Sequence, residues 1–146
     1  MGFVFRFQTL LDWKRDLEEL SQMKLAEIGQ RLRSQEEEIR RLTDRRLREE
    51  AELQKKMAGG IETKELLTYK LSEEDSYQNL LRMEAKMQEI QKEMEEERNR
   101  LIGLMQERKT VEKLKEKSLK SYLRKMEKEE QKTADELFLA RYNRKA

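Results

Sequence analysis

The chain has 146 residues, of which 44% are charged, yet its net charge at pH 7 is only +2. It contains no cysteine, histidine or proline. These absences exclude disulfides, thiol and imidazole chemistry and the usual zinc sites, and they leave helices free of proline breaks. Ala, Glu, Lys, Leu and Arg make up 87 of the 146 residues, a composition typical of coiled coils. We therefore expect an all-α protein with no catalytic residues, no cofactor and no bound metal.

Two apolar stripes with the alternating three- and four-residue spacing of a coiled coil run through residues 10–57 and 69–137. The only adjacent glycines, Gly59 and Gly60, lie between the stripes and supply the positive φ angles of a tight hairpin turn. The pattern predicts one antiparallel coiled-coil hairpin over residues 1–146. Its expected elements are helix one at about 5–57, a tip at 58–62 and helix two, continuous, at about 63–142.

In an antiparallel pair of helices, the residue numbers of facing residues have a constant sum. Here that sum is about 122, which pairs Leu53 with Tyr69. Below Ile28 the residues taken for the stripe, Lys24 and Leu20, are spaced by fours, so we expect a stutter that moves the sum to about 121. The pairs expected there are Leu20 with Leu101, Leu17 with Leu104, Leu10 with Val111, and Trp13 with Arg108 through a cation–π contact.

The two arms are unequal, because residue 3 lies level with about residue 118. Roughly 28 residues of helix two, about 40 Å of helix, therefore have no partner within the hairpin. Apolar residues without cover imply a binding partner. Residues 109–146 hold twelve Lys and Arg against seven Asp and Glu, so this overhang is also basic. Its apolar members are Tyr122, Met126, Leu137, Phe138 and Tyr142.

Charged and polar clusters have competing interpretations. Glutamates interleave with the lysines of the basic end, which favours ion pairs along the helix over phosphate binding. They are Glu112, Glu116, Glu127, Glu129 and Glu130. We expect no nucleic-acid partner, while a solvated face and a face for a protein remain open. The glutamate runs 36–38 and 95–97 are expected to be solvated. Polar seam residues such as Arg46 either specify register or leave the tip loose.

Several short segments resemble the FliJ family of flagellar export proteins, and the resemblance covers the full length. They are the N-terminal Phe5-x-Phe7-x-x-Leu10-Leu11, the tip Met57-Ala58-Gly59-Gly60-Ile61 followed by Leu66 and Tyr69, and the closing Asp135-Glu136 with Arg141-x-x-Arg144-Lys145. The resemblance implies a cytoplasmic protein that is not an enzyme and needs no cofactor.

FliJ-type proteins resemble the shaft of rotary ATPases. The resemblance implies a stalk, monomeric in isolation, whose terminal end enters the hexameric export ATPase FliI. Its hairpin side would reach the export gate protein FlhA at the cytoplasmic face of the inner membrane, and the family is also associated with export-chaperone escort. The ATPase contacts we expect are Phe3, Phe7, Lys120, Arg124, Lys128, Leu137, Phe138, Arg141, Tyr142 and Arg144, and the gate contacts are Leu66, Leu67, Tyr69 and Tyr77.

Three other interpretations remain open. A parallel homodimeric scaffold needs a helix through Gly59 and Gly60, which costs about 2 kcal/mol relative to alanine, and it stacks Arg46 on Arg46. The stalk of an archaeal- or vacuolar-type rotary ATPase usually has a longer chain. An injectisome stalk is barely separated from the flagellar one by these residues.

Overall fold

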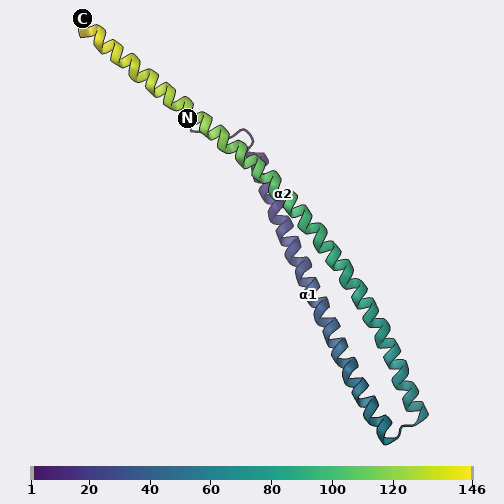
Figure 1. The fold of residues 1–146 in the computed structure, drawn as a ribbon. Helices are drawn as coiled ribbons and strands as arrows, with labels where there is room; N and C mark the ends of the chain where they lie inside the picture. The colour runs from purple at the N-terminus through teal and green to yellow at the C-terminus, as the bar shows by residue number, and fades with distance from the viewer. Residues whose placement is uncertain (1, 146) are drawn as a thin grey trace. The chain divides into compact units, whose positions relative to one another are not determined.

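The computed structural model describes residues 2–145, and within them the secondary structure consists of two α-helices, α1 (Gln8–Gly59) and α2 (Thr63–Lys145). The helices pack against each other as an antiparallel hairpin, which confirms the predicted fold class (Figure 1). The chain divides into two compact units. Unit 1 combines Met1–Leu20 with Leu101–Ala146, and unit 2 is Ser21–Arg100.

The hairpin turn of unit 2 lies at the predicted glycines. α1 ends at Gly59, two residues beyond the predicted end, and Gly60 follows with a φ of +87°. The amide of Gly60 donates to the carbonyl of Met57 at 3.4 Å. α2 then begins at Thr63 as predicted and continues without a break to Lys145. Gly60 is needed here because a Cβ is strained in the left-handed region.

The seam of unit 2 follows the predicted register. Leu42, Leu53 and Ile28 of α1 are buried, as is Ile90 of α2. Polar seam residues have partners across the seam. Arg46 Nε donates to Ser76 Oγ at 3.2 Å, and these two residue numbers sum to 122. Gln35 Nε2 likewise donates to the carbonyl of Met83 at 2.9 Å, so polar seam positions are satisfied by specific groups of the other helix.

The predicted stutter is wrong. Ser21 Oγ donates to Glu97 Oε1 at 2.7 Å, and both residues are buried, whereas Leu20 is 62% exposed and Lys24 is exposed. Ser21 lies seven residues before Ile28, so α1 keeps its coiled-coil phase. The expected pair of Leu20 with Leu101 therefore does not form. The helix keeps this phase because a hydrogen bond satisfies the polar groups that the seam buries.

α1 begins at Gln8 in unit 1, three residues later than predicted. The carbonyl of Phe5 accepts a hydrogen bond from the Gln8 amide at 3.2 Å, and residues 2–7 before the helix are not helical. Phe5 is only 6% exposed, and Leu11 is fully buried. The residue that closes this end of the seam is therefore Leu11, while its neighbour Leu10, which we expected to face Val111, is 38% exposed.

The expected cation–π pair of Trp13 with Arg108 is also wrong. Trp13 is 54% exposed, and the cation above its ring is Lys14, with Nζ 4.9 Å from the ring centroid. Arg108 instead donates to the carboxylate of Glu18, which is 8% exposed. A buried carboxylate requires a charged partner, and this requirement takes Arg108 away from the indole.

α2 continues beyond the part of unit 1 that pairs with the N-terminal residues. The last half-buried residue is Tyr122, whose ring centroid lies 5.5 Å from that of Phe3. Residues 123–145, here called the bare segment, are helical and exposed throughout (yellow end of α2 in Figure 1). The predicted overhang is thus confirmed, with its start about four residues later and its end at Lys145 instead of 142.

The two turn glycines form a matched pair for mutation. Gly60→Ala should lower the free energy of unfolding by about 1 kcal/mol, because alanine is strained at positive φ. Gly59→Ala should raise it by up to about 0.5 kcal/mol, because Gly59 is helical and a Cβ there meets nothing within 4 Å. Urea unfolding followed by circular dichroism measures both. Equal effects would contradict the assigned turn.

Candidate partner-binding surfaces

The described residues offer surfaces for partners and no metal centre. No group of three or more His, Cys, Asp or Glu within residues 2–145 is arranged to hold a metal ion. In the same part of the chain, neither helix is long and apolar enough to cross a membrane. The candidate binding features are exposed apolar and basic side chains on the helices. Each group of such side chains lies within one unit.

The bare segment carries large apolar side chains that are exposed. Leu137, Phe138 and Tyr142 are 60%, 69% and 65% exposed. Exposed apolar groups of this size on a helix without a neighbour are candidates for burial against another protein. The basic residues predicted to accompany them are exposed as well, namely Lys120, Arg124, Lys128, Arg141 and Arg144.

The N-terminal phenylalanines form a separate aromatic cluster. Phe3 lies against Tyr122, and Phe5 meets Phe7 edge to face with centroids 5.9 Å apart. Phe7 is 40% exposed. Leu137 lies fifteen residues after Tyr122 on the same helix, roughly 22 Å along its axis. The ATPase-contact residues expected from the sequence therefore form two apolar groups on unit 1 instead of one continuous patch.

Ion pairs hold the first turns of α1 to α2 in unit 1. Lys14 pairs with Glu107 at 2.7 Å. Arg108 donates to Glu18 and, at 2.9 Å, to Glu112. The pKa of Arg108 is raised by its hydrogen bond to Glu18 and then by that to Glu112. The pKa of Glu112 is lowered mainly by its hydrogen bond from Arg108. This network fixes the level on α2 at which the paired part of unit 1 ends.

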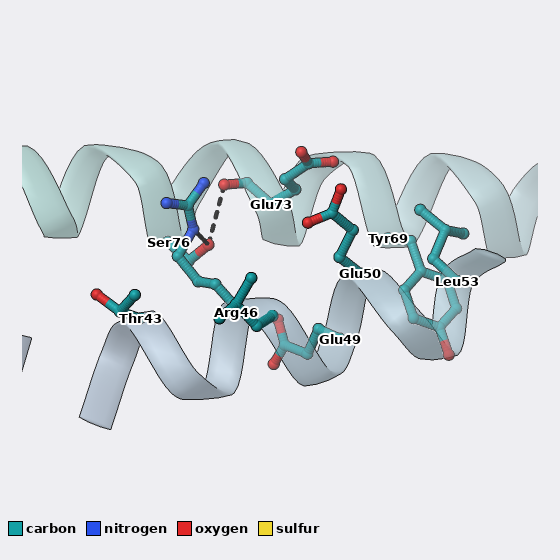
Figure 2. A pocket seen from close by; sticks show the side chains of 9 residues that line it. Thr43, Arg46, Glu49, Glu50, Leu53, Tyr69, Glu73 and Ser76 are labelled. Carbon is teal, nitrogen blue, oxygen red and sulfur yellow. Dashed lines mark hydrogen bonds between the residues drawn. The ribbon is translucent and has the colours of Figure 1, made fainter. Parts of the chain in front are cut away.

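A groove between α1 and α2 lies near the tip of unit 2. It encloses about 140 Å³. Figure 2 shows Arg46 reaching across the groove to Ser76, whose hydroxyl also donates to the carbonyl of Glu73 at 3.0 Å. The exposed Leu47 forms part of one wall, and half-buried Tyr69 forms part of the other. The groove is lined by Thr43, Arg46, Leu47, Glu49, Glu50, Leu53, Tyr69, Glu73 and Ser76.

The predicted gate-contact residues lie on α2, and Tyr69 is the one of the four that lines the groove. Tyr77 is 44% exposed and lies under Arg46, whose guanidinium carbon is 5.4 Å from the ring centroid. Leu66 is half-buried and lies at nearly the same angle around α2 as Tyr77, at about 100° per residue. Leu67 is 58% exposed but about 100° away from Leu66. The structure thus groups Leu66 and Tyr77 and separates Leu67 from them.

Tyr69 is the least available of the four predicted gate residues. It is half-buried, and Lys56 Nζ lies 5.0 Å above its ring. The same ammonium donates to Glu65 at 2.9 Å. The pKa of Lys56 is raised, first by the hydrogen bond to Glu65 and then by that to Tyr69. Tyr69 therefore works chiefly as part of a contact that holds the two helices together next to the turn.

Three expectations about charged residues need correction or extension. The run 95–97 was expected to be solvated, but Glu97 is 7% exposed and accepts a hydrogen bond from Ser21. The acids of the basic end were expected to form ion pairs along the helix. Glu112 does so with Arg108 of the same helix at 2.9 Å, whereas Glu116 and Glu127 form no ion pair within residues 2–145. The ion pairs of this region involve Glu112, which turns toward α1. The seam residues Glu18 and Ser21 were missed because they are polar. Glu18 lies seven residues after Leu11, and Ser21 lies seven residues before Ile28, and this heptad spacing is the signal that identifies them.

The fold and these surfaces define the class of protein: an antiparallel coiled-coil hairpin that presents exposed helix faces to partners. The family model described as Flagellar FliJ protein matches residues 3–146, so the chain belongs to the FliJ family. Neither a search of curated proteins nor a search of solved structures gave a match. Membership associates the protein with the flagellar export apparatus, and the family is one of export components.

The ion-pair network of unit 1 predicts a loss of stability in acid. The pKa of Glu112 in the folded protein lies below its ordinary 4.5. Its contribution to stability is therefore present above about pH 4.5 and is lost as the pH falls through the lowered value. Glu112→Gln should reduce the thermal midpoint at pH 7 and flatten its decline toward about pH 3.

The matched control for this acid effect is Glu129→Gln. The Glu129 side chain is exposed in the bare segment and has no ion pair within the described residues. This variant should keep the midpoint and the acid profile of the parent chain in circular dichroism melts. The same profile for both variants would refute a stabilising role for Glu112.

Proposed function

We propose that the protein is the non-enzymatic central stalk of the flagellar export ATPase. In this proposal the terminal end of the chain enters the FliI hexamer, and the hairpin side contacts the gate protein FlhA. The observation that carries the proposal is the bare segment. A single helix with exposed apolar and basic side chains continues from a paired base, and its apolar residues have no cover within the described chain.

A lone helix suits the centre of a ring for a reason of symmetry. Six identical subunits surround one axis, but a helix presents different side chains in each direction. Each subunit would therefore meet a different surface, with Phe138 toward one and Arg141 toward another. Contacts that differ between subunits shift their conformational populations differently, which is the physical requirement for a stalk that affects ATP turnover.

The tip of unit 2 is the proposed site for FlhA. Support comes from the groove beside Tyr77 and from the exposed Leu47 on its opposite wall. An amphipathic segment of the gate would pack against the two helices and bury these side chains. The protein would then act in the cytoplasm, at the inner face of the membrane that holds the gate, and would also escort export chaperones.

Truncation after residue 118 tests the ATPase role. It removes the bare segment, and we expect stimulation of ATP hydrolysis by the FliI hexamer to be lost. The full-length variant Leu137→Glu/Phe138→Glu should also lose most of the stimulation, because it places two charges where we propose apolar contacts. A steady-state phosphate-release assay measures both. Unchanged stimulation by the truncated chain would end the proposal.

Truncation also removes Tyr122, the partner of Phe3, so its effect on folding needs a control. Circular dichroism melts should leave the Leu137→Glu/Phe138→Glu variant with the parent midpoint, because both side chains are exposed. Leu47→Ala, in unit 2, serves as the activity control. It should stimulate hydrolysis like the parent chain.

The gate contact is tested by capture of the cytoplasmic region of FlhA. Tyr77→Ala should weaken capture about tenfold, because an aromatic anchor in a docking surface contributes on the order of 1–2 kcal/mol. Leu67→Ala should weaken it less, since Leu67 lies on a different face of α2 from Tyr77. A pull-down with purified proteins measures both variants. Undiminished capture by Tyr77→Ala would remove this site from the proposal.

A further inference from the structure

Five cations form one row along α2 in unit 1. Their spacing is four, three, four and four residues, which keeps them on one face of an α-helix. At about 100° per residue they fall within an arc of about 80°, and they extend over roughly 22 Å of helix axis. We call this row the basic ridge; it consists of Lys113, Lys117, Lys120, Arg124 and Lys128.

Within the described residues, no carboxylate of the protein forms an ion pair with the basic ridge. All five side chains are exposed, and none makes an ion pair or a hydrogen bond within residues 2–145. The ridge lies nearly opposite the half-buried Val111 and Ser118, which face the N-terminal residues of the chain. It is therefore open to a ligand while the paired part of unit 1 is intact.

A membrane surface fits the ridge poorly. A helix that lies on an anionic bilayer buries an apolar face flanked by its cations. Here the nearest apolar stripe, Leu119 with Leu123 and Met126, is centred about 120° around the helix from the ridge. The carboxylates of Glu116 and Glu127 lie in between. Phospholipid headgroups would repel these acids whenever both faces met the bilayer.

Nucleic acid fits poorly for a related reason. Single-stranded binding combines cations with aromatic side chains on which bases stack. The one aromatic residue in this stretch, Tyr122, lies on the seam side against Phe3. Four of the five cations are lysines, which act as point charges, whereas arginine favours paired contacts with phosphate. The bordering glutamates would also face the phosphates.

We infer that the basic ridge binds a row of carboxylates on a partner protein. This inference rests on the proposed function and specifies its chemistry: the inner surface of the ATPase ring that surrounds residues 113–128 is acidic. Lysine side chains are long and hydrated, so the contact orients the helix and speeds association while remaining weak and sensitive to salt. It is separate from the apolar contacts of Leu137 and Phe138.

Two variants of equal charge test the ridge. Lys117→Gln/Lys120→Gln removes two cations from it, and Lys125→Gln/Lys132→Gln removes two exposed cations of the same helix that lie off it. Binding of the full-length chain to the FliI hexamer is measured by fluorescence anisotropy. At about 50 mM salt the ridge variant should bind about tenfold more weakly, and the control should stay within about twofold of the parent. At about 300 mM salt the gap between the variants should close.

The outcomes separate this inference from the proposed function. Equal binding by both variants, with the parent chain bound, would overturn the ridge and leave the stalk intact. No binding by the parent chain would remove both. Vesicles of phosphatidylglycerol and a short DNA duplex are run alongside. If either binds the parent chain more tightly than the ring does and loses more binding in the ridge variant, the ridge is not a protein-binding face.

Discussion

Polar side chains at seam positions need partners, and this need holds the two helices in one phase. In unit 2 the buried Ser21 donates to the buried Glu97, and Arg46 reaches Ser76. In unit 1 the buried Glu18 accepts from Arg108. If one helix moved along the other by one heptad, these groups would be separated. Buried donors and acceptors would then lack partners, which is costly in free energy. The register of the two helices follows from these pairs.

Such a seam gives specificity at the expense of stability. Buried ion pairs lose much of their attraction to desolvation, and apolar residues of similar size are often more stabilising. The seam nevertheless buries no side-chain polar atom without a partner within the described residues. The arrangement therefore favours one register over its neighbours, because every buried polar side chain of the seam has a specific partner.

The sequence allowed the prediction of every feature that depends on strong local or periodic signals. The glycine pair located the turn, and apolar spacing located the seam from Leu53 to Ile28. The prediction failed at two polar seam residues of α1, although it placed the polar Arg46 in the seam correctly. Glu18 and Ser21 look like surface residues by their chemistry, and their heptad spacing from Leu11 and Ile28 was overlooked. Leu20 was therefore taken into the core, although it is exposed. The start of α1 failed similarly, because Phe5 is buried outside the helix.

Among the candidate surfaces, the exposed apolar residues of the bare segment were predictable from the overhang, and the ridge was not. Its recognition required knowing that Glu112 turns to Arg15 and Arg108, and that Glu116 and Glu127 leave the lysines unpaired. The same applies to the tip, where Leu66 and Tyr77 could be named from composition. The structure adds that Tyr77 lies under Arg46, which lines the groove together with Leu47.

Residues 123–145 are helical without a tertiary neighbour in the described chain, so only backbone hydrogen bonds and local side-chain contacts hold their turns. A helix of this kind is marginal in water, and its turns open and reform readily. A receptor that closes around it must first immobilise it, and that ordering consumes part of the interaction free energy. Under the proposed function, attachment through such a segment would be selective yet readily reversed, and the complex would come apart and form again without unfolding of the hairpin.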